Sequence, residues 1–438
     1  MNDEPIQHEL LGPLSVSGTT EFGDTPGRSP EHLQRVGKRF IAIFTLASFG
    51  MYLTVLMPTL FSLAYKIQTL APESKQGNLG LVIGIGALVG LLTGPLLGAW
   101  SDRTTVRWGR RRPFLVAGIG LNLAGALTIA VSSSIAGVLA GWLISIVAQG
   151  SVSAAILPTI AEGVPAAQRG VLGAFVGVAT QLAGVASGLF GSFLTHSDLL
   201  LFGIPVLVLT VVAIPFLVAI PDHPAVPEGR ADGAGKVSRS ILSDLRRERD
   251  YTFVLLGKFL MQMGMSFFST YQLYFLLDRL GMTPESAGQK LALVGGIGVV
   301  VTTLSAIVSG VISDRISRRK PFIYTAAALI ALGLSAMALS HDLWGYASGA
   351  LLLLAGAGMF GSVDLALVSD VMPGEGAQAG KFMGIYNLAA VIPGAIAPLV
   401  APLLLRIGGG GNYTVLFLVA AVTALGAGLT VSRVAAVR

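Results

Sequence analysis

Two ionisable residues lie inside long apolar stretches of the sequence, and they are the side chains best placed to do chemistry. Lys258 lies about seven residues, and Asp364 about six residues, from the more basic end of its stretch. If the stretches are helices, a rise of about 1.5 Å per residue puts both side chains roughly 10 Å into the apolar region. A charge there costs about 2.5–3.5 kcal/mol on insertion scales, so such a residue is usually paired or functional. An ammonium and a carboxylate at this depth suit ion pairing and proton exchange.

The rest of the sequence offers no other reactive constellation. With no cysteine, the chain has no disulfide, no thiolate metal site and no cysteine nucleophile. Its 5 histidines show no metal-ligand spacing, and no phosphate-binding loop of the form GxxxxGK[ST] occurs. A GxGxxG match at residues 356–361 stands in the middle of an apolar run, where helix packing explains it. We therefore expect no cofactor, no metal site, no enzymatic activity and no direct use of ATP.

Composition indicates which elements must position these residues. The chain has 438 residues, of which 53% are hydrophobic and 12% are charged, and its mean hydropathy is +0.75. These values exclude a soluble enzyme, a disordered scaffold and a disulfide-rich secreted module. Continuously apolar runs of about 20 residues predict helices that cross a bilayer, rather than alternating barrel strands. We expect twelve helices, near residues 40–65, 77–100, 113–133, 135–157, 170–195, 199–220, 251–277, 286–312, 321–339, 343–368, 382–405 and 413–432.

The positions of Lys and Arg predict how the chain is oriented. With the N-terminus inside, 23 of the 29 basic residues fall in cytosolic segments and only 5 fall in outer loops. This bias places both termini in the cytosol of a multi-pass protein of the cell membrane, which we expect to be a bacterial plasma membrane. The basic residues then meet anionic lipid, so we expect the lipid bilayer and not nucleic acid as their partner.

The twelve runs divide into two halves of six. Polar, Pro- and Gly-rich residues 221–250 predict a cytosolic linker between a bundle over residues 40–220 and a second bundle over residues 251–433. Residues 1–39 contain no hydrophobic signal segment and predict a disordered cytosolic tail, and residues 434–438 predict a second, short tail.

The two halves repeat one pattern. GAWSDR at residues 98–103 recurs as GVISDR at 310–315, an offset of 212, and RRPF at 111–114 recurs as RKPF at 319–322. Runs four and five align with runs ten and eleven at an offset of 211. Duplicated six-helix halves place a solute site at their interface near mid-membrane, and transport follows from rocking of the halves.

These loop motifs carry a family resemblance. GAWSDR followed by GRRRP at 109–113, with its weaker copy in the second half, resembles the signature of the major facilitator superfamily. Its particular form is similar to the glycoside–pentoside–hexuronide branch, and within that branch to sucrose carriers and their animal and bacterial relatives. The resemblance covers about residues 40–433. It implies an all-α membrane protein with twelve transmembrane helices in two pseudo-symmetric six-helix bundles, working by alternating access.

The resemblance also implies gating roles for the loop residues. Glycines at every fourth position from 86 to 98 give span 2 a bare face, which the family analogy places against span 11. Asp102 would then meet the start of span 11, where the helix dipole favours an anion, and Asp314 would meet the start of span 5. The arginines at 110–112 would pair with Glu162 or lipid phosphate, although simple retention of the loop in the cytosol also explains them. The gating candidates are Gly98, Asp102, Arg103, Arg110, Arg111, Arg112, Glu162, Arg169, Gly310, Asp314, Arg315, Arg319 and Lys320.

In this superfamily, spans 1, 4, 7 and 10 form the cavity walls, so Lys258 in span 7 and Asp364 in span 10 could meet. Three interpretations stay open: a pair that solute or a proton breaks during turnover, a static structural pair, or two independent groups with Lys258 reaching toward the cytosol. Polar and aromatic residues of the same walls suit a neutral sugar, and equally suit ordinary bonds between helices. The solute-binding candidates are Tyr52, Gln149, Ser153, Gln181, Gln262, Tyr271, Gln272 and Asn387.

We therefore expect a monomeric secondary transporter that moves a neutral sugar or glycoside, with a proton as its second partner. An exporter of hydrophobic or drug-like compounds is the first alternative. The low charge of the cavity favours it, whereas Ile146 stands where drug–proton exporters usually carry an arginine. A non-transporting membrane scaffold or receptor is the alternative of another class, and two symmetric gating loops argue against it.

Overall fold

The computed structural model describes residues 35–219, 248–373 and 377–435 of the chain, with side chains omitted for 377–380. Most of the expected N-terminal tail and of the expected linker at 221–250 therefore lies outside the described residues. Everything that forms regular structure in the described part is helical.

The first half opens with a span of three successive helical segments and continues through seven further helical segments, long and short. They are α1 (Lys38–Met57), the π-helix η2 (Pro58–Ser62), α2 (Leu63–Leu70), η3 (Pro72–Ser74), α3 (Lys75–Asp102), α4 (Arg112–Val131), α5 (Ile135–Ile156), α6 (Pro158–Gly163), α7 (Ala166–Leu194) and α8 (Asp198–Ala219). The second half follows a similar order and again has a π-helical segment in its first span, here at the end of that span. It comprises α10 (Arg249–Tyr274), the π-helix η4 (Phe275–Arg279), α11 (Pro284–Ile316), α12 (Lys320–Leu339), α13 (Leu343–Val371), α14 (Ala377–Leu405) and α15 (Tyr413–Ser432).

Twelve helices of the described residues are long and apolar enough to cross a membrane, which confirms the predicted twelve spans. Several are longer than their apolar runs predict. Helix α11, for example, covers Pro284–Ile316 rather than 286–312, because Thr283 caps its start and the helix continues into the polar loop motif. Helix ends in such proteins extend past the hydrocarbon, and hydropathy alone does not locate them.

The two halves are also alike in how their helices pack. A Cβ atom on Gly141 of α5 would lie 2.8 Å from the Gly125 carbonyl oxygen of α4, and one on Gly349 of α13 would lie 2.6 Å from the Gly333 carbonyl oxygen of α12. Both helix pairs therefore pack backbone against backbone, which glycine alone permits. The N-terminal capping residue of α13, Asp342, likewise takes the place that a serine has at the start of α5.

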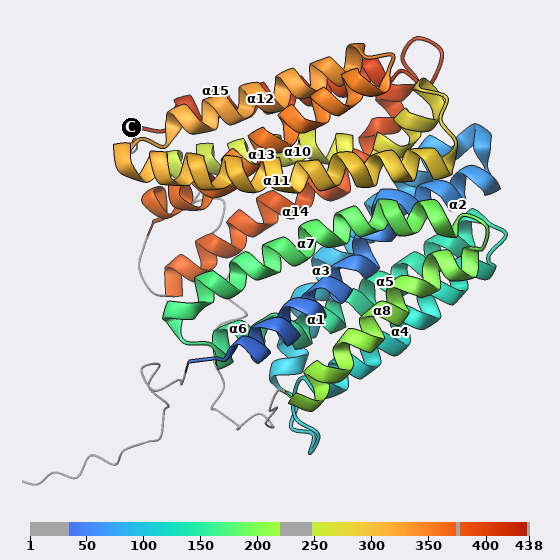
Figure 1. Ribbon diagram of the computed structural model, residues 1–438. Coiled ribbons are helices and arrows are strands. Elements are labelled where there is room, and N and C mark those ends of the chain that lie inside the picture. The colour runs from blue at the N-terminus through green and yellow to red at the C-terminus, as the bar shows by residue number, and fades with distance from the viewer. Residues whose placement is uncertain (1–34, 220–247, 374–376, 436–438) are drawn as a thin grey trace, which may run out of the picture.

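Figure 1 shows the arrangement of the halves. The helices of the first half (blue to green) and those of the second (yellow to red) form two bundles that meet near α2 and diverge toward the end where α1 begins and α15 stops. We call the latter the basic end, because Arg103, Arg110–Arg112 and Arg318–Lys320 lie there, and the other the closed end.

Candidate functional site

A cavity of about 620 Å³ lies between the two bundles. The first half contributes residues of α1, η2 and α7, and the second half contributes residues of α10, α11, α13 and α14. Its volume is in the range typical of small-molecule sites. All the side chains that line it are uncharged. The cavity is therefore suited to a neutral solute reached from helices of both halves.

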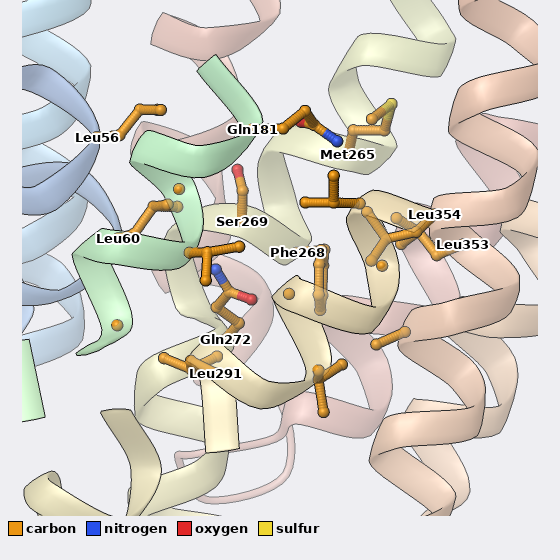
Figure 2. A pocket seen from close by; sticks show the side chains of 18 of the residues that line it. Leu56, Leu60, Gln181, Met265, Phe268, Ser269, Gln272, Leu291, Leu353 and Leu354 are labelled. Atoms are coloured by element: carbon orange, nitrogen blue, oxygen red, sulfur yellow. The ribbon is translucent and has the colours of Figure 1, made fainter. Parts of the chain in front are cut away.

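The polar groups of the cavity come mainly from one face of α10. Gln262, Ser266, Ser269 and Gln272 follow one another at intervals of three or four residues, which places them on one side of a helix. Gln181 of α7 adds an amide from the other half. In Figure 2, Ser269 and Gln272 lie between the leucines of α1 and η2 on one side and those of α13 on the other. The cavity thus combines amides and hydroxyls with aliphatic walls.

The two intramembrane charges meet in the second half. Lys258 Nζ of α10 forms an ion pair with Asp364 Oδ2 of α13, and only 15% and 3% of these side chains are exposed. The hydroxyl of Tyr386 on α14 donates to the same carboxylate oxygen. The ammonium also lies 3.2 Å from the Tyr386 hydroxyl and 5.2 Å from the centre of the Phe360 ring. Three helices therefore enclose one buried, neutralised charge pair.

This cluster, Lys258–Asp364–Tyr386, lies next to the cavity. Lys258 precedes Gln262 by one helical turn on α10, and Tyr386 precedes the cavity residue Ala390 by one turn on α14. One turn corresponds to about 5.4 Å along the helix axis. The charge pair consequently lies at the side of the cavity that is nearer the basic end.

At the closed end, an ion pair joins the two halves. Lys75 Nζ of α3 lies 2.5 Å from Asp278 Oδ1 of η4, with 15% and 28% of the two side chains exposed. The Tyr413 hydroxyl donates to Asp278 Oδ2 at 2.6 Å and accepts from the Gln76 amide at 3.2 Å. The hydroxyl of Tyr271 donates to the Gln76 carbonyl at 3.0 Å. Together these bonds tie α3 to α10, η4 and α15.

Close backbone contact completes the closure on the other side of the molecule. A Cβ atom on Gly188 of α7 would lie 2.8 Å from the Gly288 carbonyl oxygen of α11, and the reverse distance is also 2.8 Å. The ring of Phe61 in η2 lies against both Gly191 and Gly288. Any larger residue at Gly188 or Gly288 would force the helices apart.

The bundles are separate toward the basic end. A Cβ atom would meet nothing within 4 Å at Gly94 and Gly98 of α3, at Gly173 of α7 or at Gly384 of α14. Every hydrogen bond found between described residues of the two halves lies at the closed end. The molecule is thus closed at one end and open at the other.

The gating candidates of the first half form a compact network within that half. Arg111 is buried and pairs with Asp102 at 2.9 Å and with Glu162, and it donates to the Ala154 carbonyl at 3.0 Å. Arg110 lies 2.6 Å from Glu162. The structure therefore brings Arg110 and Arg111 to Glu162, one of the two partners that the sequence suggested. No contact of Asp102 with the start of α14 is found, and side chains 377–380 there lie outside the described residues.

The glycine face predicted for α3 is partly wrong. Gly86 lies against Trp142 and Gly90 against Ile146, both in α5, so this part of the face packs within its own half. Helix α14 approaches α3 instead at Gly80 and Gly84, where Pro398 and Leu399 lie. The spacing correctly marks a helix surface of small residues, but the crossing of α3 and α14 decides which residues they touch.

In the second half, Asp314 pairs with Arg319, whose Nε lies 3.5 Å from Asp370 Oδ2. The hydrogen bond with Asp314 raises the pKa of Arg319 above its already high usual value, so the guanidinium stays charged. Arg169 donates to the carbonyls of Ala161 and Val164 rather than to Asp314. Lys320 donates to the Val434 carbonyl at 2.5 Å. Of the other gating candidates, Arg103 and Arg315 are exposed, and Arg112 begins α4. Gly310 faces Ser362, with a Cβ distance of 3.7 Å.

The solute-binding candidates fall into two groups. Gln181, Gln262 and Gln272 line the cavity. The other five do not. Gln149 accepts a hydrogen bond from Thr54 at 3.1 Å, and Ser153 donates to its own helix. Tyr52 packs against the two hydrophobic cores, Tyr271 belongs to the closed end, and Asn387 is exposed.

Sequence reasoning missed Tyr386, Ser266, Ser269 and the Lys75–Asp278 pair. The serines follow Gln262 at helical spacing, so the periodicity of α10 could have revealed them. Tyr386 carries no charge that distinguishes it within an apolar run. Among the described residues, no group of three or more His, Cys, Asp or Glu side chains is placed to hold a metal ion.

Known proteins share sequence and fold with this chain. The family model described as Major Facilitator Superfamily matches residues 39–379 and, in a second match, residues 300–437. The chain is 42% identical over 82 residues to the human Proton-associated sugar transporter A, a match that covers 18% of this chain and 11% of that protein. It is 25% identical over 124 residues to the Sucrose transport protein SUC3 of Arabidopsis thaliana, covering 27% and 21% of the two chains. The chain thus matches only a small part of the length of these relatives.

Solved structures share the fold over nearly the whole chain. A variant of the nucleoside transporter NupG superposes with a TM-score of 0.71 at 12% identity, covering 90% of this chain and 99% of the other. The D-xylose–proton symporter superposes with a TM-score of 0.68 at 17% identity, covering 89% and 97%. At these identities the comparison establishes a common fold.

Proposed function

We propose that this chain, which belongs to the major facilitator superfamily and is a secondary transporter, carries a neutral sugar or glycoside together with a proton. The single observation that carries the proposal is an uncharged, amide-lined cavity between the two halves, one helical turn from a buried Lys–Asp–Tyr cluster.

The chemistry of the cavity favours a neutral solute with many hydroxyl groups. The amides of Gln181, Gln262 and Gln272 each offer both donors and acceptors, and the serines of α10 offer hydroxyls. Phe268 provides an aromatic surface among them. A charged solute would have to leave water without a counter-charge in the lining, which is costly. The partial similarity to proteins named for sugar and sucrose transport supports the same solute class.

The buried charge pair supplies a site at which a proton can be exchanged. Protonation of Asp364 would cancel its attraction for Lys258 and leave an ammonium next to the cavity. The oxygen ligands in contact are one carboxylate and one tyrosine hydroxyl, fewer than hard metal cations usually take. A proton is therefore the favoured coupling ion.

The orientation follows from the basic residues. Because the basic end carries the arginine-rich loops, it lies in the cytosol by the positive-inside rule. The structure then corresponds to an inward-open state, with the Lys75–Asp278 contact closing the outside. Export of a sugar or of another solute would use the same two states in the reverse direction.

Uptake into proteoliposomes tests the proposal. Labelled sucrose, maltose and methyl β-glucoside are offered with and without an imposed inward proton gradient. We expect accumulation of at least one sugar that depends on the gradient, and loss of accumulation in Asp364→Asn, with sugar exchange across the membrane retained. Gradient-driven accumulation that is unchanged in Asp364→Asn would contradict the coupling role, and failure to transport any sugar would contradict the solute class.

A second candidate function is export of hydrophobic compounds. The leucines that line the cavity, among them Leu56, Leu60, Leu353 and Leu354, favour it because they would accommodate an apolar solute. Proton-driven expulsion of lipophilic dyes from the same proteoliposomes, without sugar uptake, would support this alternative.

A further inference from the structure

Tyr386 touches both members of the buried ion pair. Its hydroxyl donates to Asp364 Oδ2, the oxygen that also receives the Lys258 ammonium, and the ammonium lies 3.2 Å from the hydroxyl oxygen. The ammonium also lies 4.9 Å from the centre of the Tyr386 ring. Asp364 Oδ1 takes no hydrogen bond from the part of the chain that the structure describes. One carboxylate oxygen thus accepts two hydrogen bonds, and the other oxygen is available to accept a proton.

The tyrosine is held in place more firmly than the lysine. Only 5% of Tyr386 is exposed. One turn earlier on α14, the Phe382 carbonyl accepts a hydrogen bond from Tyr251 of α10, and the rings of these two residues meet edge to face at 5.1 Å. This contact fixes α14 against α10. Lys258, in contrast, has a long side chain with four rotatable bonds and an uncharged cavity one turn away.

We propose that Tyr386 is a positioning residue for proton exchange at Asp364: its hydroxyl holds the carboxyl group in place and sets the pH at which the proton binds, while Lys258 is the partner that leaves. The inference rests on the proposed coupling role of Asp364. Tyr386 was absent from the sequence-based candidates. In this proposal Tyr386 holds the carboxyl group of Asp364, and Lys258 moves away from it.

The step conserves protons and charge. A proton from water binds Asp364 Oδ1, forming a neutral carboxylic acid. Tyr386 keeps its own O–H bond and still donates to Oδ2, so the acid does not move. Lys258 keeps its three protons and loses only its counter-charge, which frees the ammonium to turn toward Gln262 in the cavity. Loss of the proton reverses each of these changes.

The titratable surroundings of Asp364 are few. Lys258 faces it from α10 and Tyr386 from α14, with Tyr251 beside Tyr386. Helix α11 presents hydroxyls to α13, as in the Ser309–Ser362 contact, and α12 presents aliphatic residues such as Ile330. The proton therefore binds under the control of one cation and one phenol.

Helix α14 connects Tyr386 to the cavity and to the closed end. The same helix lines the cavity at Ala390 and Gly394, and at Pro398 its carbonyl accepts from Tyr271 at the closed end. Pro393 lies within the cavity-lining stretch, where it removes one helical hydrogen bond. A carboxyl group that stays bound to Tyr386 thus stays connected to the helix that forms the closure.

Infrared titration of the purified protein in lipid nanodiscs tests the inference without any solute. The carbonyl stretch of protonated Asp364 is identified as the band that Asp364→Asn removes, and its amplitude is followed against pH. Tyr386→Phe removes a donor that favours the carboxylate. We expect the midpoint of the band to move to higher pH by about one unit, the scale of one hydrogen bond to a charged group.

Tyr346→Phe is the matched control. It removes another buried phenol hydroxyl, which bonds α13 to Gln272 of α10 but touches neither Asp364 nor Tyr386. We expect its midpoint to equal that of the unmodified protein. An unshifted midpoint in Tyr386→Phe, an equal shift in both variants, or the lack of any band that Asp364→Asn removes would each overturn the inference.

A second substitution keeps the test decisive if Tyr386→Phe fails to fold. Replacement of Tyr386 by 3,5-difluorotyrosine retains the ring and makes the hydroxyl a stronger donor, so the midpoint should move to lower pH. A midpoint that stays in place or moves to higher pH would contradict the role of the hydroxyl. Failure of sugar uptake in proteoliposomes would bear on the proposed function alone, because the titration needs no solute.

Discussion

Removal of one charge at the closed end should shift the balance between the two states of the transporter. Asp278 accepts from Lys75 at 2.5 Å and from Tyr413 at 2.6 Å, and the contact with Lys75 joins helices of different halves. In Asp278→Asn the neutral amide keeps the shape but loses the charge on each bond. A hydrogen bond to a charged group contributes about 1.5–3 kcal/mol, and partial exposure favours the lower value. A loss of about 1.4 kcal/mol corresponds to a tenfold change in the equilibrium.

The absence of cysteine in the chain provides the assay. Ser269→Cys places a single thiol in the cavity, and a membrane-impermeant thiol reagent is added from the outer side. Because only the outward-open state exposes this thiol to the reagent, we expect labelling about tenfold faster when Asp278→Asn is added.

The matched control is Asp198→Asn. Asp198 forms an ion pair with Lys66 at 2.6 Å on the same side of the membrane, but both residues belong to the first half. Its loss should leave the labelling rate unchanged. Equal rates in both variants, or no acceleration in Asp278→Asn, would refute the view that the Lys75–Asp278 contact holds the outside closed.

Three further outcomes are expected. Gly288→Ala places a Cβ 2.8 Å from the Gly188 carbonyl oxygen and should therefore raise outside labelling of the Ser269→Cys thiol. Gly296→Ala on the same helix meets open space and should leave the labelling rate unchanged. Equal rates in the two variants would contradict the closure. Gln262→Leu should raise KM for a sugar of the proposed class about tenfold, as loss of a solute hydrogen bond implies. An unchanged KM in uptake assays would remove Gln262 from the proposed site. Arg111→Ala removes the buried guanidinium that pairs with Asp102 and Glu162 and should destabilise the protein by about 1–2 kcal/mol, since both carboxylates are partly exposed. Exposed Arg103→Ala should have little effect. Thermal unfolding in detergent measures both, and equal Tm values would contradict the network.

Much of the architecture could be predicted because hydropathy, charge and repetition are local properties of the sequence. The twelve spans follow from apolar length. The cost of an isolated charge in hydrocarbon made a contact of Lys258 with Asp364 one of the interpretations that the sequence left open, and the structure shows that contact. The proximity of Arg110 and Arg111 to Glu162 could be anticipated for a similar reason, since all three lie in loops at one end.

Features that depend on how the helices cross could not be predicted from the sequence. Tyr271 was expected in the cavity, but it lies two residues beyond Ser269, about 200° around the helix, and faces the closed end instead. Lys75 and Asp278 are 203 positions apart and meet only because the halves lean together. Tyr386 lacks the charge that made its two partners conspicuous. Each of these residues owes its role to a neighbour from another helix.

The central claim is that the two halves close at one end as they open at the other. Double electron–electron resonance on spin labels attached to introduced cysteines measures this directly, with one pair at Glu73 and Arg406 near the closed end and another at Thr105 and Arg318 at the basic end, all exposed. When Asp278→Asn is added, the account predicts that the distance between the labels at the closed end lengthens while the distance at the basic end shortens. A change at one end alone, or a change of the same sign at both ends, would contradict it.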